Sequence, residues 1–362
     1  MKKTLSVVLT SAMVLSLAAC GGGGKTPETT KAPDTTAAAG QDTTAAADQG
    51  AAAGDKVEGE EVSIKFGNTN GEQDIQTMSL LEVEKRLEAA TDGKFAVDVF
   101  PSSSLGVTDD LTEQAMQGAA ILTVSDPGRL AAFVKDYGII QMPYMFEDYT
   151  MLDKLLETDS YKKWEKEFEE QGIKLVTSNW YSGERQMVCN KEVNKPEDLK
   201  GLRIRTIGSE LFTESISAMG AVPTPMEWSE VYPSIQQKAL DGAEVQTPSS
   251  YATRLYEICS VTNKTGHFQL IGSVVTGTKF YDSLSPEYQE LFTKTFREVG
   301  TDYQQKCVDL SAEYEKEMSE QHGMEIHELD KSPFIEAVQP VYEKLGYSEL
   351  RDSLKSELDA VK

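Results

Sequence analysis

Two kinds of hydrophobic periodicity alternate along the chain from residue 62 onward. Every second residue is apolar in residues 62–66 and again in residues 95–99, the pattern of a strand with one buried face. Between them, apolar residues recur at helical spacing over residues 72–91, and Gly93 stands where a helix commonly ends. This order predicts a β-α-β unit and favours a mainly parallel sheet.

The same alternation continues through much of the remaining sequence, in two series. The later segments are helix 109–118, strand 120–125, helix 150–171, strand 173–178, strand 202–205 and helix 209–219. A chain of 362 residues is longer than one average domain. We therefore expect an α/β protein with two lobes.

Residues 286–322 predict one long helix. Ser285 supplies an N-cap hydroxyl, Pro286 suits the first helical position, and no further proline occurs before Gly323. About 37 residues at ~1.5 Å per residue make a helix of roughly 55 Å, which is longer than one lobe. We expect this helix to run along both lobes and to bend near Gly300.

The first twenty residues are typical of a targeting segment. Two lysines precede an apolar run over residues 5–17, which is shorter than the ~20 residues of a membrane span. The following Leu-Ala-Ala-Cys resembles a bacterial lipobox, in which a signal peptide, here residues 1–20, ends at a lipidated cysteine, Cys20. An ordinary secretory signal is the alternative. We expect a lipoprotein anchored to the cell membrane on its extracytoplasmic face.

Residues 21–61 differ in composition from everything that follows. They begin with four glycines, continue with Thr, Ala, Pro, Asp and Gln, and contain no aromatic residue. Such a segment cannot bury enough apolar surface to offset the entropy lost on ordering. We expect a disordered, low-complexity tether between the lipid anchor and the folded part.

The chain is strongly acidic, with 35 Lys and Arg against 59 Asp and Glu. Residues 1–61 contain five lysines and eight acidic residues, so about −21 of the formal charge of −24 falls on residues 62–362. Nucleic-acid binding needs a basic face, as does electrostatic docking on anionic lipid. We expect no nucleic-acid partner, and an anionic ligand would have to be held by a few placed arginines.

Cysteine and histidine are scarce, with 4 Cys and 3 His, so we predict no metal site and no cofactor. Cys189, Cys259 and Cys307 follow the lipobox, and no C-x-x-C pair occurs. Buried free thiols are the expectation. A disulfide between Cys189 and Cys259 is the alternative.

Motifs of common enzyme classes are absent or incomplete. The sequence contains no GxGxxG that opens a helix, no GxxxxGK[ST] and no GxSxG. Residues 160–163 match SxxK and residues 264–266 match KTG, as in penicillin-binding enzymes, but no SxN triplet lies between them. Ser160 also lies in a highly charged predicted helix, where a nucleophile would face water. We expect a protein that is not an enzyme.

Arginines at strand ends are the strongest candidates for ligand binding. Arg203 and Arg205 lie two residues apart in a predicted strand, so their side chains share one face. Arg205 ends that strand, and α/β folds hold ligands in the crevice at the carboxyl ends of strands. A guanidinium there can bind a carboxylate through two parallel hydrogen bonds. A surface ion pair is the alternative in so acidic a chain.

Six short segments match the signatures of one protein family. Three of them are Asn194-Lys-Pro-Glu-Asp-Leu-Lys-Gly-Leu-Arg-Ile-Arg205, Met219-Gly-Ala-Val-Pro-Thr-Pro-Met-Glu-Trp-Ser-Glu-Val-Tyr232 and Leu240-Asp-Gly-Ala-Glu244. The others are Phe100-Pro-Ser-Ser-Ser-Leu-Gly106, Gln141-Met-Pro-Tyr-Met-Phe146 and Tyr281-Asp-Ser-Leu-Ser-Pro286. They resemble, in order and over roughly residues 62–300, the solute-binding subunits of TRAP (tripartite ATP-independent periplasmic) transporters, the C4-dicarboxylate-binding DctP-like family.

The resemblance implies an α/β, two-lobe periplasmic-binding-protein fold (type II-like, TRAP class). The ligand would lie between lobes that are joined by a hinge and braced by the long helix. Lobe I is expected to comprise residues 62–182 and about 271–310. Lobe II is expected to comprise residues 183–270 and about 311–362.

The resemblance also implies roles for the residues at matching positions. Arg205 matches the arginine that binds the ligand carboxylate bidentately, and Arg185 matches a second arginine that assists it. Trp228 matches the aromatic residue that packs over the ligand, and Asn68 matches a polar contact from the other lobe. Ser125 begins a polar segment of the first lobe and is a further candidate for the cleft.

One position departs from the family pattern. Val245 stands where the family usually has an asparagine that hydrogen-bonds the ligand, and Val cannot donate. Either Gln246 or Thr247 takes that role, or the distal end of the ligand is less polar than a hydroxylated or short dicarboxylate. We carry Gln246 forward as the candidate.

The function implied is that of an extracytoplasmic solute-binding protein. It would capture a carboxylate-bearing organic acid, such as a dicarboxylate, and deliver it to the small and large membrane permease subunits of a TRAP transporter. We expect a monomer. A binding lipoprotein of an ABC importer and a ligand-sensing receptor component are the alternatives.

Overall fold

The computed structural model describes residues 56–361, so the predicted signal peptide, Cys20 and most of the predicted tether lie outside the described residues. The strands are β1 (Val62–Gly67), β2 (Phe95–Phe100), β3 (Ile121–Ser125), β4 (Ile173–Cys189), β5 (Arg203–Thr206), β6 (Val222–Pro225), β7 (Gly242–Gln246), β8 (Val261–Gly277) and β9 (Glu325–His327). The α-helices are α1 (Ile75–Thr91), α2 (Thr108–Met116), α3 (Pro127–Leu130), α4 (Met151–Leu155), α5 (Asp159–Glu170), α6 (Glu210–Ala218), α7 (Val231–Gln236), α8 (Thr247–Ala252), α9 (Thr278–Tyr281), α10 (Pro286–His322), α11 (Ser332–Leu345) and α12 (Ser348–Ala360). The 3-10 helices are η1 (Lys135–Gln141), η2 (Pro196–Leu199), η3 (Trp228–Glu230) and η4 (Leu255–Glu257).

The described strands form one nine-stranded sheet in the order β2-β1-β3-β8-β4-β7-β5-β6, with β9 beside β8. At one end, β1 pairs in parallel with β2 and β3, and at the other end β5 pairs in parallel with β6 and β7. We call these ends lobe I and lobe II. In the centre, β4 and β8 are antiparallel to each other and to their outer neighbours β7 and β3. The expected parallel pairing is therefore confirmed within each lobe and wrong at the centre.

The two central strands pass from one lobe to the other. The predicted strand 173–178 continues to Cys189, and β4 and β8 each contain 17 residues. The first part of β4 pairs with the last part of β8 near β3, whereas residues 185–189 of β4 also pair with β7. The β4–β8 register shifts at several points between residues 175 and 187, as expected where strands bend and twist. These two strands form the connection on which the lobes are hinged.

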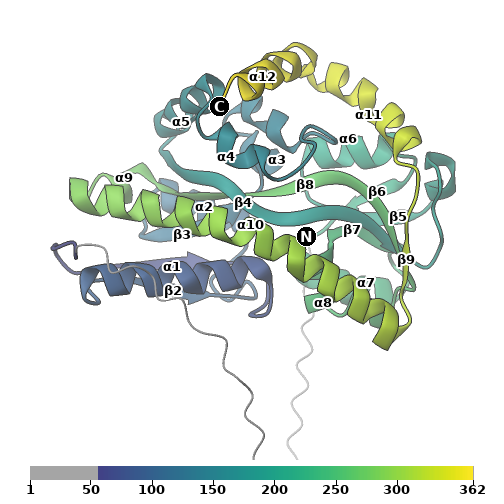
Figure 1. The fold of residues 1–362 in the computed structure, drawn as a ribbon, viewed down its shortest axis with the longest axis horizontal. Helices are drawn as coiled ribbons and strands as arrows, with labels where there is room; N and C mark the ends of the chain where they lie inside the picture. The colour runs from purple at the N-terminus through teal and green to yellow at the C-terminus, as the bar shows by residue number, and fades with distance from the viewer. Residues whose placement is uncertain (1–55, 362) are drawn as a thin grey trace, which may run out of the picture. The chain divides into compact units, whose positions relative to one another are not determined.

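Helix α10 confirms the long predicted helix and extends along both lobes (Figure 1). Ser285 caps its first turn by accepting a hydrogen bond from the Tyr288 amide, and Gly323 ends it in the left-handed conformation at φ 71°. Beside lobe I, the Trp180 indole on β4 donates to the Phe296 carbonyl at 2.9 Å. Farther along, α10 packs against α8 of lobe II. Within residues 56–361, no helix has the length and apolar character that crossing a membrane requires.

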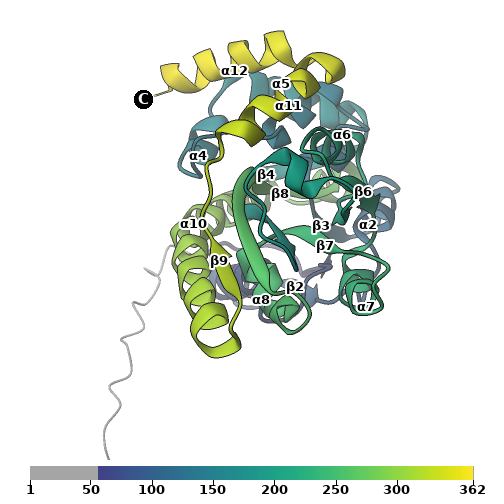
Figure 2. The same ribbon diagram turned by 90° about the vertical axis from the view of Figure 1, so that its right-hand side faces the viewer.

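Apolar cores fill the space between the sheet and its helices. In lobe I, Phe66 of β1 and Phe296 of α10 belong to one buried cluster. In lobe II, Val245 of β7 and Met318 of α10 belong to another. The opposite side of the central strands is covered by η1, α4, α5, α6, α11 and α12, whose apolar residues form the largest cluster (Figures 1 and 2).

The C-terminal helices connect segments that were predicted to belong to different lobes. The Glu357 carboxylate on α12 accepts hydrogen bonds from the Ser160 amide and hydroxyl on α5, at 2.8 and 2.7 Å. Residue 357 falls in the segment predicted for lobe II, and residue 160 in the segment predicted for lobe I. The residue boundaries of the lobes stay predictions.

Side-chain caps explain two differences from the predicted helices. Helix α1 begins three residues later than predicted because Asp74 is its N-cap and accepts a hydrogen bond from the Gln76 amide. The predicted helix 150–171 is divided into α4 and α5, because Thr158 adopts an extended conformation and caps α5. Such caps compete with helix continuation through side-chain hydrogen bonds to the backbone.

The three cysteines of the described part are free and buried, which confirms the expected thiols. Burial raises the pKa of Cys189, Cys259 and Cys307, so each remains protonated at neutral pH. The alternative disulfide between Cys189 and Cys259 is wrong.

Candidate functional site

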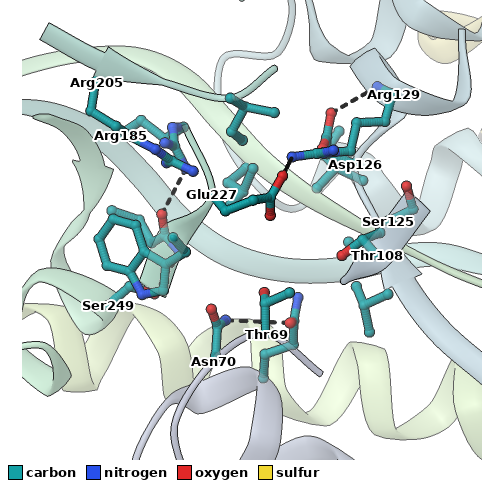
Figure 3. A pocket seen from close by; sticks show the side chains of 18 residues that line it. Thr69, Asn70, Thr108, Ser125, Asp126, Arg129, Arg185, Arg205, Glu227 and Ser249 are labelled. Atoms are coloured by element: carbon teal, nitrogen blue, oxygen red, sulfur yellow. Dashed lines mark hydrogen bonds and ion pairs between the residues drawn. The ribbon is translucent and has the colours of Figure 1, made fainter. Parts of the chain in front are cut away.

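A polar cavity lies where the two lobes face each other, beside the central strands. Lobe I contributes residues after β1 and β3, and lobe II contributes residues of β4, β5, β7 and the η3 region. The polar and charged residues of its lining are Thr69, Asn70, Gln76, Thr108, Ser125, Asp126, Arg129, Arg185, Arg205, Glu227, Gln246 and Ser249 (Figure 3). A cleft between lobes with convergent polar groups is a common form of small-molecule site.

Arg205 is a buried cation without an acidic partner among the described residues. It lies in β5 near its carboxyl end, and only 4% of its surface is exposed. Its Nε and one terminal nitrogen both donate to the Met226 carbonyl oxygen, at 2.9 and 2.8 Å. Burial, with a contribution from the Arg185 charge, lowers the pKa of Arg205 to about 10, so it is still protonated at neutral pH.

The indole of Trp228 lies against this guanidinium, with the ring centroid 5.2 Å from the Arg205 Cζ. A cation over an aromatic face is attracted by the ring quadrupole, but the ring supplies no negative charge. Both side chains line the cavity. The stacked ring therefore fixes the orientation of the guanidinium and leaves its charge available to an anion.

Arg185 is satisfied within the protein. It is 2% exposed, and its Nε pairs with the Glu244 carboxylate. Its terminal nitrogens donate to the Gln246 side-chain oxygen at 2.9 Å and to the Glu244 carbonyl at 2.6 Å. Burial is the largest influence on Glu244 and would raise its pKa, but the Arg185 charge together with hydrogen bonds from His267 and Arg185 lowers that pKa to about 2. His267 Nε2 lies 3.7 Å from the same carboxylate.

A chain of hydrogen bonds crosses the cleft from Arg185. Gln246 accepts from Arg185 and donates from Nε2 to the Ser249 hydroxyl at 2.6 Å. Ser249, on α8 of lobe II, donates to the carboxylate of Asp74, the N-cap of α1 in lobe I. Burial raises the pKa of Asp74 although this bond and one from Asn70 oppose the shift. The two lobes are therefore joined by a side-chain contact at the base of the cavity.

A second contact between the lobes lies on the other side of the cavity. The Arg129 guanidinium in lobe I lies 3.3 Å from Asp126 and 3.3 Å from Glu227, which belongs to lobe II. Arg129 also pairs with Asp109. Figure 3 shows Arg205 and Arg185 together on one side and Asp126 with Arg129 on the other.

The structure brings five of the six predicted ligand-binding residues into this lining. Arg205, Arg185, Trp228, Gln246 and Ser125 line the cavity. That each of them contacts a ligand stays a prediction.

Asn68 is the predicted residue that does not line the cavity. It follows β1 as expected, but it is 3% exposed and donates to the Thr77 hydroxyl at 2.7 Å. Its side-chain oxygen accepts from the Asn70 amide at 3.2 Å, so it shapes the turn that presents Thr69 and Asn70 to the cavity.

The alternation of side chains along β7 explains Val245. Glu244 and Gln246 point toward Arg185, whereas Val245 is 1% exposed and belongs to the lobe II core. Gln246 therefore supplies the polar group at this edge of the cavity. Thr247 does not line the cavity, and its hydroxyl donates to Glu315 at 3.1 Å.

Several lining residues were not predicted individually from the sequence. Asp126 and Arg129 lie in a segment that was considered only as a group, and Glu227 lies inside a family-like segment at a variable position. Ser249 and Asn70 carried no distinguishing pattern. The sequence offered only weak signals, namely that Glu227 is an acidic residue next to Trp228 and that Arg129 follows the end of a strand. Such placements are common, so they do not single out a residue of the site.

The enzyme-like motifs do not converge. The Ser160 hydroxyl donates to Glu357, and Lys264 pairs with Glu315 at 2.8 Å. Neither residue lines the cavity.

Elsewhere in the described part, Glu192, Glu325 and His327 have potential ligand atoms within 4.8 Å of one another. They lie outside the cavity and two of them are exposed, a grouping that is common without a bound ion. The expectation of no metal stays a prediction.

Comparison with known proteins identifies the family. A family model described as bacterial extracellular solute-binding protein, family 7 (DctP) matches residues 66–349. The C4-dicarboxylate-binding periplasmic protein DctP of Vibrio cholerae is 27% identical over 294 residues, which cover 78% of this chain and 86% of that protein. The sialic acid-binding periplasmic protein SiaP of the same organism is 25% identical over 299 residues, which cover 83% and 92%.

Solved structures agree with this assignment. A TRAP periplasmic solute-binding protein from Escherichia fergusonii, in an apo open form, is 33% identical with a TM-score of 0.73, and the match covers 83% of this chain and 100% of that chain. Another from Ochrobacterium anthropi, with bound L-fuconate, is 30% identical with a TM-score of 0.79 and coverage of 82% and 99%. The chain therefore belongs to family 7 of the bacterial extracellular solute-binding proteins, the DctP family of TRAP solute-binding subunits.

Proposed function

We propose that this solute-binding protein captures an organic acid by a carboxylate that binds Arg205. The observation that carries the proposal is a guanidinium that is 4% exposed, borders a cavity and has no acidic partner among residues 56–361. A buried charge without a counter-ion is costly, and a ligand carboxylate removes that cost. The planar fork of Arg suits such a group.

The remaining cavity residues complete this site. Arg185, held in place by Glu244 and Gln246, assists Arg205 at the same end of the ligand, and Trp228 packs along the ligand. Gln246 and Ser125 offer polar contacts from opposite lobes. Since Asn68 is engaged with Thr77, we propose the neighbouring Asn70 as the lobe I amide that contacts the ligand.

Solved relatives support an acid with hydroxyl groups. Structures that are 30% and 29% identical to this chain hold L-fuconate and L-galactonate. The cavity of this protein is similarly rich in side chains that donate or accept hydrogen bonds. Those two acids and their chemical relatives are the first ligands to test.

The lipid anchor and the permease partners belong to the same proposal. We propose that Cys20 carries a lipid that holds a monomeric protein on the extracytoplasmic face of the membrane, where it delivers ligand to small and large permease subunits. Replacement of Cys20 with Ser should release the protein from membranes into the soluble fraction. Retention of that variant in the membrane fraction would contradict the anchor.

Two other binding functions remain to be separated from TRAP transport. A binding protein of an ABC importer or of a sensing receptor would use a similar cleft. Genes for a small and a large permease subunit beside this gene favour TRAP transport. Their replacement by genes for an ATPase or a receptor kinase favours the alternatives.

Arg205→Ala tests the carboxylate site. With L-galactonate at about 100 times its Kd, the unfolding free energy of the wild type should rise by about 2.7 kcal/mol, and this increase should vanish in the variant. Thermal unfolding with and without L-galactonate or L-fuconate measures the effect. Arg203→Ala is the matched control, because Arg203 lies in the same strand but is exposed and pairs with Asp241 at 2.9 Å. Undiminished stabilisation in Arg205→Ala would exclude the assignment.

A further inference from the structure

We propose that the cavity selects acids with a single carboxylate and disfavours acids with a second one, because Glu227 and Asp126 add negative charge to the lining around Arg129. The inference rests on the proposed function, since it takes Arg205 as the group that holds the first carboxylate. It makes Glu227 a residue that determines specificity.

The charges around the cavity leave one positive charge unpaired. Five charged side chains line it, namely Arg185, Arg205, Arg129, Asp126 and Glu227. The Arg185 charge is matched by the buried Glu244 carboxylate behind it. Arg129 has acidic partners of its own, which leaves the Arg205 guanidinium as the lining cation without one among the described residues. One ligand carboxylate is enough to neutralise it.

Arg129 is not available as a second anion site. Three carboxylates surround it, from Asp126, Glu227 and Asp109. Each of its three guanidinium nitrogens faces one of these carboxylates, so little of the guanidinium remains for a ligand. One cation among three anions gives this side of the cavity a negative local charge. Another carboxylate would have to displace one of these partners and would meet the repulsion of the others.

Hydrogen-bonding capacity leads to the same conclusion. Ionised carboxylates accept hydrogen bonds and cannot donate them. Apart from Arg185 and Arg205, the lining therefore presents acceptors at Asp126 and Glu227, together with side chains of Asn70, Thr108 and Ser125 that can donate or accept. A ligand hydroxyl can donate to these acceptors, whereas a second carboxylate has no proton to give. The distal end that fits is neutral and hydroxylated.

Matched acids test this selectivity. L-Galactonate and galactarate share one carbon chain and differ in having a hydroxymethyl group or a carboxylate at the far end, and D-gluconate and D-glucarate form a similar pair. Isothermal titration calorimetry at neutral pH and low salt should show the monocarboxylate binding at least tenfold tighter within a pair, which corresponds to about 1.4 kcal/mol. Succinate and 4-hydroxybutyrate extend the test to short acids.

A charge-removing variant localises the effect. In Glu227→Gln the ratio of monocarboxylate to dicarboxylate affinity should fall by about tenfold, because one repulsive charge is removed and Arg129 loses a partner. Glu230→Gln is the matched control, since it makes the same charge change three residues away at an exposed position that does not line the cavity. The control should keep the wild-type ratio.

The outcomes separate this inference from the proposed function. Binding of neither acid in any pair contradicts the carboxylate-binding function itself. Binding of the dicarboxylate as tightly as its partner, or more tightly, overturns the selectivity and leaves the function intact. The role of Glu227 is overturned if the ratio of monocarboxylate to dicarboxylate affinity is unchanged in Glu227→Gln. It is also overturned if that ratio falls equally in Glu230→Gln.

Discussion

The arginines around the cleft differ in how their charge is balanced. Arg185 is held by Glu244 and Gln246, so its position is fixed before any ligand arrives. Arg205 has a backbone carbonyl and an aromatic ring as neighbours, and neither carries a negative charge. The protein therefore bears the desolvation cost of one guanidinium until an anion binds. We expect affinity for a carboxylate to follow from this imbalance.

The Arg185–Glu244 pair should make stability depend on pH in the acidic range. The folded-state pKa of Glu244 is about 2 against an ordinary value of 4.5, so its stabilisation is complete above about pH 4.5 and is lost as the pH falls toward 2. The pKa difference corresponds to roughly 3 kcal/mol. Replacement by Gln removes this contribution and leaves Arg185 buried without its partner. Glu244→Gln should be several kcal/mol less stable than the wild type at neutral pH.

Urea unfolding of both proteins between about pH 5 and about pH 3 measures the prediction. The difference in unfolding free energy between wild type and Glu244→Gln should shrink as the pH falls. Glu230→Gln, at an exposed position, serves as a control for the general effect of losing one acid. A difference that stays constant across this range would show that Glu244 titrates near its ordinary pKa.

At the scale of elements, α10 packs along β4 where that strand passes between the lobes. Asn179 on β4 donates to the Arg297 carbonyl at 2.9 Å, and Gln304 on α10 donates back to the Asn179 carbonyl at 3.1 Å. Gly300 lies between these two bonds, and the helix passes through it without a break. A side chain there would enter the strand, since a Cβ would lie 2.3 Å from Asn179 Oδ1 and 2.8 Å from Trp180 Cδ1.

Gly300→Ala should therefore destabilise the protein although alanine favours helices. The helix propensity gained is about 1 kcal/mol, whereas overpacking against β4 costs typically 1–3 kcal/mol. We expect a net loss of up to about 2 kcal/mol in urea unfolding. Glu298→Ala, at an exposed position of the same helix, should change stability by less than about 0.5 kcal/mol. A Gly300→Ala variant more stable than the wild type would show that helix and strand separate easily here.

For the molecule as a whole, we expect closure of the cleft to depend on the contacts that join the two lobes. The Ser249–Asp74 hydrogen bond and the Arg129–Glu227 ion pair lie on either side of the cavity. A ligand shifts the equilibrium between open and closed forms only by binding one of them more tightly. Contacts between the lobes stabilise the closed form. They therefore reduce the free energy that ligand binding must supply to close the cleft.

Ser249→Ala should favour the open form. It removes a donor from the buried Asp74 carboxylate, a loss of about 1–3 kcal/mol in the closed state. The affinity for L-galactonate should fall by roughly tenfold, and small-angle scattering of the free protein should show a larger radius of gyration. Ser250→Ala is a close control, because that hydroxyl is buried next to Ser249 and has no hydrogen-bond partner. Equal effects of the two variants would argue against a role for the Ser249–Asp74 contact in closure.

Local pattern was enough to predict the fold class and most elements, and with the family resemblance it predicted an arginine, Arg205, that lines the cavity. Strand alternation, helix periodicity and the Ser285–Pro286 start are short-range features, so they are visible in a linear sequence. The family-like segments around Arg205 and Trp228 are also contiguous, which is why five of the six predicted site residues line one cavity. Asn68 shows the limit, because hydrogen bonding within its turn decides which of three neighbouring residues faces the cleft.

The sequence by itself determined a two-lobe α/β protein with an arginine at a strand end. Only the tertiary structure decided which charges are paired. Arg185 and Arg205 are the same residue type in the sequence. Arg185 pairs with Glu244 across β4 and β7, whereas Arg205 contacts a backbone carbonyl and an aromatic ring. Glu227 and Arg129 are 98 residues apart and meet across the cleft. The strength of an ion pair depends on the distance between its charges and on their burial. Both are determined by strand pairing and lobe packing, which bring together residues that are remote in the chain.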